Sequence, residues 1–278
     1  KKDSKQLGSL GAGFSIQKGV KTTVTIRNKT KHDISNFTIK VNGFESGNMR
    51  VSEVVLSKFS TKGKFVDIIH EIDVPVGYGF GSSAAVALSL SIALNDALEC
   101  KLSKIKVAQI AHDVEIECKT GLGDVLASYY GGFEIRDKPG APGIGHVQNI
   151  TLNKISIIMI CFSPISTSKF IKERLPRING LGGKMVNELL KSKNYEHFQE
   201  MSLEFAKYVD VMTPRMQKVV NELSKNNIKC GIALFGETIF SMIPKENENK
   251  ILKILEKYSD GIIIKSELDN TGARVLYN

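Results

Sequence analysis

The segment Pro75-Val-Gly-Tyr-Gly-Phe-Gly-Ser-Ser-Ala-Ala85 leads into a run rich in Ala, Leu and Ser that has no Gly or Pro before Leu98. Such a run predicts a buried helix. The alternating glycines Gly77, Gly79 and Gly81 allow positive φ angles and a close approach of the backbone to a bulky ligand. The helix start leaves backbone N–H groups unpaired and carries partial positive charge. The segment therefore predicts an anion-binding loop.

The glycine spacing differs from that of the two commonest phosphate motifs. No Gly-Lys-Ser/Thr follows, as a Walker A loop requires, and the third glycine falls at the wrong interval for the dinucleotide fingerprint. Ser82 and Ser83 follow the glycines directly, and hydroxyls at such a place can ligate magnesium. A glycine-rich turn before a helix is also common in proteins that bind no anion, so the loop alone leaves both interpretations open.

Length and composition indicate a protein with a sizeable core. The 278 residues suffice for one large domain or two ordinary ones, and 42% of them are hydrophobic. Apolar runs such as Ile155–Phe162 are far too short to span a bilayer, and no signal peptide is visible. The 4 cysteines lie far apart without metal-ligand spacing, which predicts reduced thiols in a cytoplasmic protein. Because the chain opens at Lys1 without methionine, we expect further residues, with an early strand, to precede it.

The formal net charge of +9 raises the possibility of nucleic-acid binding. The lysines are spread along the chain, however, and no arginine-rich helix or basic segment interleaved with aromatic residues occurs. A solvated basic surface explains the charge better, and it would favour anionic small substrates. A non-catalytic RNA-binding protein remains the alternative from a different class, and it predicts binding that depends steeply on salt.

The chain before the glycine loop reads as strands joined by turns. Alternating polar and apolar residues predict strands at Val20–Arg27, Asn36–Asn42 and Val66–Val74. After the loop and its helix, apolar residues at helical spacing predict a second helix over Leu102–Cys118, capped by Ser103. The segment from Tyr129 to Arg136 then reads as a turn and a strand.

The densest break in composition is the Pro/Gly-rich loop Asp137–Gly145, and we place a domain boundary just beyond it. The resulting prediction is a first domain over residues 1–150 and a second over residues 151–278. In the second, patterning predicts a buried strand at Lys154–Phe162 and a polar loop at Ser163–Lys172. The further elements alternate between helices and strands, which indicates an α+β fold: helices Gly180–Lys191, Tyr195–Val211, Pro214–Asn226 and Asn249–Tyr258, and strands Cys230–Leu234, Thr238–Ile243 and Gly261–Lys265.

Acidic residues near the glycine loop suggest phosphoryl transfer, which needs a phosphate cradle, magnesium and a group that handles the acceptor hydroxyl. Glu115, three residues after His112 on the second helix, is a candidate magnesium ligand with Ser82 or Ser83, because hard cations prefer oxygen. Asp124, in a glycine-flanked segment, is a candidate to accept the hydroxyl proton. Taken singly, an acid on a helix is usually solvated and an Asp after Gly is usually a turn residue.

The string Pro-x-x-x-Gly-Phe-Gly-Ser-Ser-Ala-Ala resembles the phosphate-binding motif of the GHMP kinases (galactokinase, homoserine, mevalonate and phosphomevalonate kinases). The resemblance implies ATP and Mg²⁺ as cofactors. It also implies a magnesium-binding Glu on the helix after the loop, at Glu115, and a catalytic Asp in a Gly-x-Asp segment, at Asp124. Ser83 joins them as a catalytic residue, and Ser82 and Ser83 as metal ligands. The implied phosphate-binding residues are Gly77, Gly79, Phe80, Gly81, Ser82, Ser83 and Ala84.

Further strings along nearly the whole chain carry a narrower resemblance: Gly8–Gly13, Ala111–Glu115, Thr120–Val125, Gly131–Arg136, Pro139–Gly143 and Gly272–Val275. Within the superfamily they resemble those of the archaeal pantoate kinases. The resemblance implies ATP-dependent phosphorylation of pantoate at its primary hydroxyl, in coenzyme A biosynthesis. Pantoate carries a carboxylate, for which Arg136, His112 and the hydroxyl of Ser9 are the expected partners. A surface arginine on a strand is the alternative for Arg136.

The resemblance also implies a fold and an assembly. The N-terminal domain is expected to be an α/β domain like that of ribosomal proteins, with a left-handed β-α-β crossover. The C-terminal domain is expected to be ferredoxin-like, with the active site between the two, and the protein is expected to be a homodimer. The glycine-rich third motif of many relatives is missing, since Gly231–Phe240 has only Gly236 at the expected turn. The sequence therefore does not fix the nucleotide that the protein prefers. A kinase of the same superfamily for homoserine or a mevalonate-type hydroxy acid remains an alternative, because only His112, Arg136 and Thr120–Val125 discriminate against it.

Overall fold

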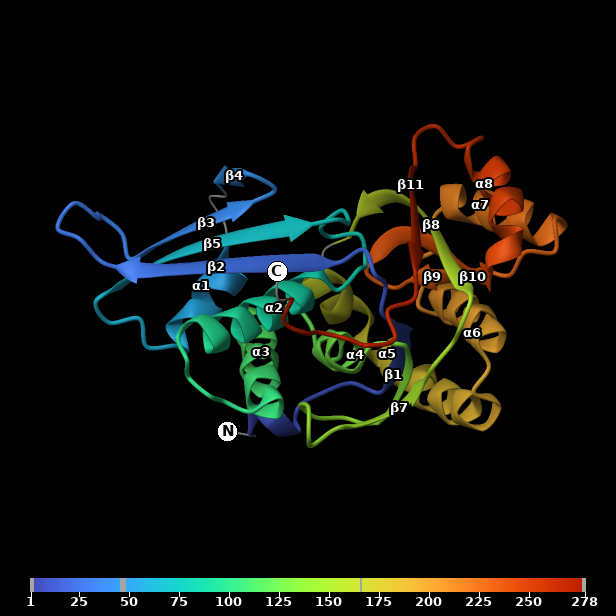
Figure 1. Cartoon of the computed structure of the whole chain (residues 1–278). Coiled ribbons are helices and arrows are strands. Elements are labelled where there is room, and N and C mark those ends of the chain that lie inside the picture. The colour runs from blue at the N-terminus through green and yellow to red at the C-terminus, as the bar shows by residue number, and fades with distance from the viewer. Residues whose placement is uncertain (1–2, 46–48, 166, 277–278) are drawn as a thin grey trace.

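The structure, a computed structural model, describes residues 3–45, 49–165 and 167–276. Figure 1 shows two sheets at opposite ends of an elongated molecule, with a small third sheet between them. Mixed helices and strands are the α+β architecture that the sequence predicts. The glycine loop lies where the two halves meet.

The first sheet has the order β2-β5-β3-β4. Strands β3 and β5 are parallel, and the chain passes from one to the other through β4 and helix α1, so the predicted β-α-β crossover is present. Its left-handed sense stays a prediction. The elements are β2 (Val20–Asn28), β3 (Phe37–Val41), β4 (Phe44–Glu45), α1 (Arg50–Ser57) and β5 (Lys64–Ile72).

Helices α2 (Ser82–Ala97) and α3 (Lys104–Cys118) cover one face of this sheet. Alternate residues of β5 are buried beneath them, among them Val66 and Ile68. The α2 run is apolar on most sides because it packs between β2, α1, α3 and α4. Ser103 caps α3 as predicted, since its side chain accepts a hydrogen bond from the backbone N–H of Lys106.

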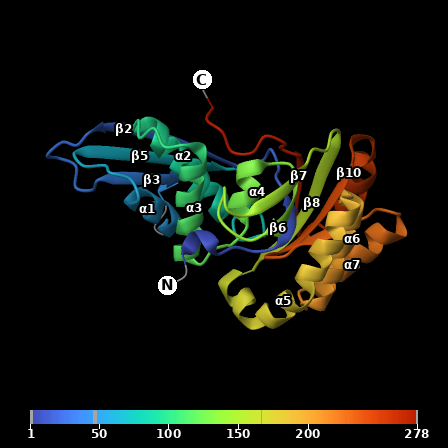
Figure 2. The ribbon, with the colours of Figure 1, turned by 90° about the horizontal axis from the view of Figure 1, so that it is seen from below.

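A three-stranded sheet of order β1-β6-β7 lies between the two halves, as Figure 2 shows. It consists of β1 (Gly11–Phe14), β6 (Phe133–Lys138) and β7 (His146–Ile150), and the short helix α4 (Asp124–Tyr130) precedes β6. The Pro/Gly-rich stretch is the connection between β6 and β7, so it joins neighbouring strands of one sheet.

The C-terminal sheet has the order β11-β8-β10-β9, and all neighbours are antiparallel. Chain order and sheet order together give the split β-α-β arrangement of the predicted ferredoxin-like fold. Several helices, instead of one, form its first connection. The elements are β8 (Ile155–Pro164), α5 (Thr167–Ser192), α6 (Tyr195–Tyr208), α7 (Pro214–Lys225), β9 (Gly231–Ala233), β10 (Gly236–Pro244), α8 (Glu248–Leu255) and β11 (Ile262–Glu267), with a 3₁₀ turn at Lys245–Asn247. Another 3₁₀ turn, Ser4–Gln6, lies near the start of the chain and contacts α3.

The sequence of β8 is a continuous apolar run because both faces of the strand are buried. Ile158 and Ile160 belong to the core beneath α7 and α8, whereas Ile157 and Met159 pack on the opposite face with Phe133 and its neighbours. A strand that is buried on both faces does not alternate.

The two halves share a core, because Phe133 and Ile135 of the small sheet pack with Ile157 and Met159 of the C-terminal sheet. The C-terminal segment returns to the first half, where the backbone N–H of Ala273 donates to the carbonyl of Ser128 at 2.8 Å. The predicted division at residue 150 therefore stays a prediction.

Three helical segments differ from the sequence prediction. Helix α1 lies where only strands and turns were expected, and α4 ends with Tyr129 and Tyr130, where a turn was expected to begin. Helix α5 begins at Thr167, although residues 163–172 were expected to form a loop. The β-branched valines of α1 favour a strand locally, but Val55 and Leu56 are buried beside α2 and α3, so packing outweighs propensity. No helix among the described residues is long and apolar enough to cross a membrane.

The core of the first half predicts a measurable stability effect. Leu90 on α2 is fully buried and does not line the cavity described below. We expect Leu90→Ala to lower the free energy of unfolding by about 2–5 kcal/mol, because truncation leaves a void in a packed core. Urea denaturation followed by circular dichroism measures it, and Ile34→Ala, at an exposed position, is the matched control. Equal stability of the two variants would contradict the described packing.

Candidate active site

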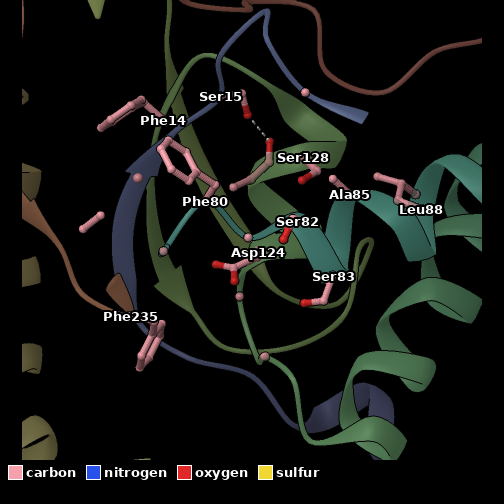
Figure 3. A pocket seen from close by; sticks show the side chains of 18 of the residues that line it. Phe14, Ser15, Phe80, Ser82, Ser83, Ala85, Leu88, Asp124, Ser128 and Phe235 are labelled. Carbon is pink, nitrogen blue, oxygen red and sulfur yellow. Dashed lines mark hydrogen bonds between the residues drawn. The ribbon is translucent and has the colours of Figure 1, made fainter. Parts of the chain in front are cut away.

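A large cavity of about 1640 Å³ lies where the two halves meet. Its walls include the segment from Gly8 into β1, the glycine loop, the start of α2, and the turn before α4. The turn between β9 and β10 closes it from the C-terminal half. Figure 3 shows this cavity, with Ser82, Ser83 and Asp124 extending into the same space from α2 and α4.

The glycine loop has the conformation that its sequence predicts. The φ angles of Gly77, Gly79 and Gly81 are +88°, +86° and +61°. Gly81 is the N-cap of α2, and no side chain caps the helix there. The first amides of α2 are therefore available to a ligand. The geometry suits an anion such as a phosphate group.

The C-terminal half holds this loop in place. The hydroxyl of Thr238 donates to the carbonyl of Tyr78 at 2.8 Å, and the N–H of Ile165 donates to the carbonyl of Gly77 at 3.0 Å. Gly236 lies so close to the carbonyl of Tyr78 that a side chain at this position would overlap it. The single glycine of the β9–β10 turn is thus needed for contact with the glycine loop.

Asp124 begins α4 and lies against the glycine loop. A methyl group on Gly81 would lie 3.1 Å from Cβ of Asp124, so the acid sits directly beside the start of α2. Burial raises the pKa of Asp124, and the charge of Arg136 opposes this effect. The carboxyl group is close enough to the loop to act on a group held next to bound phosphate.

Glu115 on α3 is 1% exposed, and its environment is incomplete. The hydroxyl of Thr120 donates to Oε1, but Oε2 is buried without a hydrogen-bond partner. A methyl group on Gly121 would lie 2.5 Å from Oε2 of Glu115 and 3.4 Å from Oδ2 of Asp124, so the two carboxyl groups flank this glycine. Burial, with a contribution from the charge of Asp124, raises the pKa of Glu115 to about 7.

These groups fit a magnesium ion. The unpartnered Oε2 of Glu115 is a hard oxygen donor that a cation would satisfy, and the hydroxyls of Ser82 and Ser83 lie at the adjoining start of α2. Among the described residues no cluster of three or more His, Cys, Asp or Glu could hold a metal by itself. A site with few protein ligands suits magnesium, which keeps several waters and binds substrate phosphates.

Ser9 and Arg136 converge beside the turn that carries Asp124. A methyl group on Gly123 would lie 2.6 Å from Oγ of Ser9 and 2.9 Å from Nε of Arg136. Arg136 is only 8% exposed and lines the cavity, so the solvated-surface alternative for this residue is wrong. A buried guanidinium next to a hydroxyl can bind a carboxylate.

His112 lies behind this group rather than in the cavity wall. It is 2% exposed, and its Nε2 lies 3.0 Å from the carbonyl of Leu7 and 3.3 Å from that of Ser4. Since both partners are acceptors, Nε2 carries the proton. Burial lowers the pKa of His112. The ring holds the segment that leads to Ser9, and direct contact with a substrate stays a prediction.

The remaining predicted residues divide between the cavity and the core. The ring of Phe80 lines the cavity. Ala84, in the first turn of α2, has its side chain fully buried in the core, so only its backbone could reach a ligand. Glu134 was not among the predicted residues. It is fully buried, and Nη1 of Arg136 donates to its Oε1. The signal in the sequence was the spacing of two between Glu134 and Arg136, which puts both on one face of β6.

The fold and the cavity define a class of phosphotransferase, with an uncapped helix start after a glycine loop and two acids beside it. The chain belongs to the GHMP kinase family. The family model for the GHMP kinase N-terminal domain matches residues 49–132, which include the glycine loop, Glu115 and Asp124.

The chain is also similar over most of its length to proteins named pantoate kinase. It is 33% identical to the one from Methanocaldococcus jannaschii over 253 residues, which cover 90% of this chain and 88% of that protein. It is 28% identical to the one from Thermococcus kodakarensis over 252 residues, 89% of this chain and 83% of that protein. A solved structure described as a phosphotransferase related to the CoA biosynthesis pathway superposes with a TM-score of 0.87 at 27% identity, over 98% of this chain and 91% of that one.

The convergence at Gly123 predicts that this position tolerates no side chain. Its φ of −140° suits alanine, so Gly123→Ala causes no backbone strain, but the methyl group would displace Ser9 and Arg136. We expect kinase kcat/KM to fall about 100-fold, because displacements of this size disturb positioning. Gly180→Ala is the control, since its methyl group would meet only the hydroxyl of the exposed Tyr208. Unchanged activity in Gly123→Ala would contradict the described convergence.

The raised pKa of Glu115 predicts a pH-dependent stability in the absence of nucleotide and metal. With a pKa of about 7 in the folded protein and 4.5 as the ordinary value, the folded state binds more protons between these pH values. This contribution is therefore fully present below pH 4.5 and is lost as pH rises through 7. We expect Glu115→Gln to be more stable than the parent at pH 8, by at most about 3 kcal/mol, and not at pH 4.

Thermal unfolding at the two pH values measures this difference. Glu117→Gln, at an exposed position on the same helix, is the control and should behave like the parent at both. A parent protein that is more stable than Glu115→Gln at pH 8 would contradict the assignment of a buried, unpartnered carboxylate.

Proposed function

We propose that the protein uses ATP to phosphorylate the primary hydroxyl of pantoate, giving 4-phosphopantoate for coenzyme A biosynthesis. The observation that carries this proposal is the convergence of Ser9 and Arg136 beside Asp124, next to the uncapped start of α2. A carboxylate site and an acid for the acceptor hydroxyl thus adjoin a phosphate cradle. The similarity to proteins named pantoate kinase along most of the chain supports the same substrate.

ATP is the phosphoryl donor, and the glycine loop with the first turn of α2 cradles its phosphates. Gly77, Gly79, Phe80 and Gly81 supply the loop, and Ser82, Ser83 and Ala84 supply the first amides of the helix. The amides and the helix dipole stabilise negative charge where it accumulates during transfer.

Glu115 holds the magnesium ion through its unpartnered Oε2, with the hydroxyl of Ser82 or Ser83 as a further ligand. The ion, when bound, neutralises charge on the transferred phosphoryl group. The backbone of Lys119–Gly123 brings Glu115 and Asp124 together, so that one short turn serves both the metal and the acceptor.

Pantoate bears a carboxylate at one end and a primary hydroxyl at the other. We place the carboxylate against Arg136 and Ser9, where a guanidinium and a hydroxyl offer donors to its oxygens. The carbon chain then directs the primary hydroxyl toward Asp124 and the glycine loop. His112 supports this site by holding the segment before Ser9, and its contact with substrate is a further part of the proposal.

Asp124 accepts the proton of the hydroxyl as its oxygen attacks the terminal phosphorus of ATP. The bond between that phosphorus and the bridging oxygen breaks, and ADP leaves with the electron pair. Ser83 assists at the phosphate through its position at the second residue of α2. An acid in this position contributes by orientation and by proton acceptance, since phosphoryl transfer depends mainly on positioning.

Cytoplasmic location and a homodimer are also part of the proposal. Coenzyme A biosynthesis and the 4 unpaired cysteines fit a reducing compartment. Only the family resemblance supports the homodimer.

The direct test is ADP release from Mg-ATP with pantoate, mevalonate, homoserine and pantothenate offered in parallel. Turnover with pantoate alone would support the proposal in full. Turnover with another of these acceptors would keep the kinase and overturn the acceptor assignment. No turnover with any acceptor would contradict the proposal, and salt-dependent RNA binding would then be the next measurement.

The role of Asp124 predicts the behaviour of Asp124→Asn. We expect turnover to fall about 10²–10⁴-fold, because an amide cannot accept the proton, while ATP binding measured by calorimetry stays nearly intact. Asp260→Asn, at an exposed aspartate that pairs with Arg215, is the control. Undiminished turnover of Asp124→Asn would remove Asp124 from the mechanism.

A further inference from the structure

Glu134 is a buried acid for which the proposed reaction has no direct use. It is 0% exposed, and its carboxylate pairs with Arg136 through Nη1. Its second oxygen, Oε2, is buried without a hydrogen-bond partner. Burying a carboxylate in this way is unfavourable, and burial raises the pKa of Glu134 to about 7. Packing alone therefore does not explain why a carboxylate is buried at this position of β6.

The arrangement of β1 and β6 is built around this pair. Glu134 and Arg136 lie on one face of β6, where the partner residues in register on β1 are Gly13 and Gly11. A methyl group on Gly11 would lie 2.7 Å from Nη2 of Arg136, and one on Gly13 would lie 3.0 Å from Oε1 of Glu134. The two glycines of β1 therefore leave the space that the ion pair occupies.

Only one side of the Arg136 guanidinium is engaged by the protein. Nη1 donates to Glu134, whereas Nε is buried without a partner, and no described residue accepts a hydrogen bond from Nη2. The free donors, Nε and Nη2, form the edge of a guanidinium that binds a carboxylate with two parallel hydrogen bonds. Oγ of Ser9 and Nε of Arg136 both lie within 3 Å of the position that a methyl group on Gly123 would take.

Asp124 is the competing partner for this cation. The charge of Arg136 acts on Asp124 as well as on Glu134, so an unrestrained guanidinium would be drawn toward the proposed proton acceptor. Such a pairing would occupy both the acid and the cation of the site. Glu134, on the same strand and two residues away, instead accepts a hydrogen bond from Nη1 of the guanidinium.

We propose that Glu134 is a positioning residue that clamps Nη1 of Arg136 and so reserves the Nε–Nη2 edge for the carboxylate of the substrate. This inference rests on the proposed function, because it assumes a hydroxy acid as acceptor. Glu134 itself touches neither the acceptor nor ATP. It sets the selectivity of the enzyme for acceptors that carry a carboxylate.

The test compares the parent and Glu134→Gln with two acceptors, pantoate and the triol in which the carboxylate of pantoate is replaced by a hydroxymethyl group. Glutamine preserves the shape of the side chain but weakens its hold on Arg136. We expect KM for pantoate to rise about tenfold, corresponding to about 1.4 kcal/mol. The kcat and the KM for ATP stay within about threefold, because the lost interaction is with a non-reacting group.

Selectivity separates positioning from a general structural role. We expect the ratio of kcat/KM for pantoate to kcat/KM for the triol to fall about tenfold in Glu134→Gln, since only pantoate uses the reserved edge. Equal losses for both acceptors, or an unchanged KM for pantoate, would overturn the inference. Glu248→Gln, at another buried glutamate, paired with Lys265 and Ser156 outside the cavity, is the matched control with unchanged kinetics.

A double-mutant cycle with Arg136→Lys tests whether Glu134 acts through Arg136. We expect Glu134→Gln to add little to the loss caused by Arg136→Lys, because the clamped group is already gone. Additive losses would overturn the inference. Failure of the proposed function is distinguishable, since the parent protein would then not turn over pantoate at all.

Discussion

The site depends on one steric constraint, the absence of side chains where acidic and basic groups come together. Gly81, Gly121 and Gly123 lie within about 2.5–3.4 Å, measured from a notional Cβ, of atoms of Asp124, Glu115, Arg136 or Ser9. Any side chain at these positions would separate groups that must act on one phosphate and one hydroxyl. Burial raises the pKa of both acids, Glu115 and Asp124, in the unliganded protein, because it disfavours their charged forms.

The two halves of the molecule contribute unequally to this arrangement. The first half and the small sheet supply Glu115, Asp124 and Arg136. The C-terminal half holds the glycine loop through the hydrogen bond of Thr238 and the close contact at Gly236. The unpartnered oxygen of Glu115 indicates that the site is incomplete without its ligands. Stability and function therefore oppose each other at this residue, as is common where charged groups are buried for a reaction.

Much of this could be predicted from the sequence, because the signals were local. The glycine loop, the cap at Ser103 and the unbroken apolar run of β8 each follow from short-range chemistry, and the family resemblance added the crossover and the ferredoxin-like half. Helix α1 could not be predicted, since its valines favour a strand until α2 and α3 bury them. The place of His112 behind the cavity could not be predicted either, because it depends on contacts with Ser4 and Leu7, which lie far away in the chain. Glu134 and Arg136 are only two residues apart, but the burial of their ion pair depends on the pairing of β6 with the distant strand β1.

The most direct test of the account is the position of the phosphate on the product, read by two-dimensional ¹H–³¹P NMR after complete turnover of pantoate. A carboxylate anchored at Arg136 directs the distal hydroxyl to Asp124, so the account predicts phosphorus coupled to the two protons of the terminal CH₂ group. Coupling to the single proton on the carbon next to the carboxylate would mean that the other hydroxyl had reacted. That result would contradict the proposed placement of the acceptor between Arg136 and Asp124.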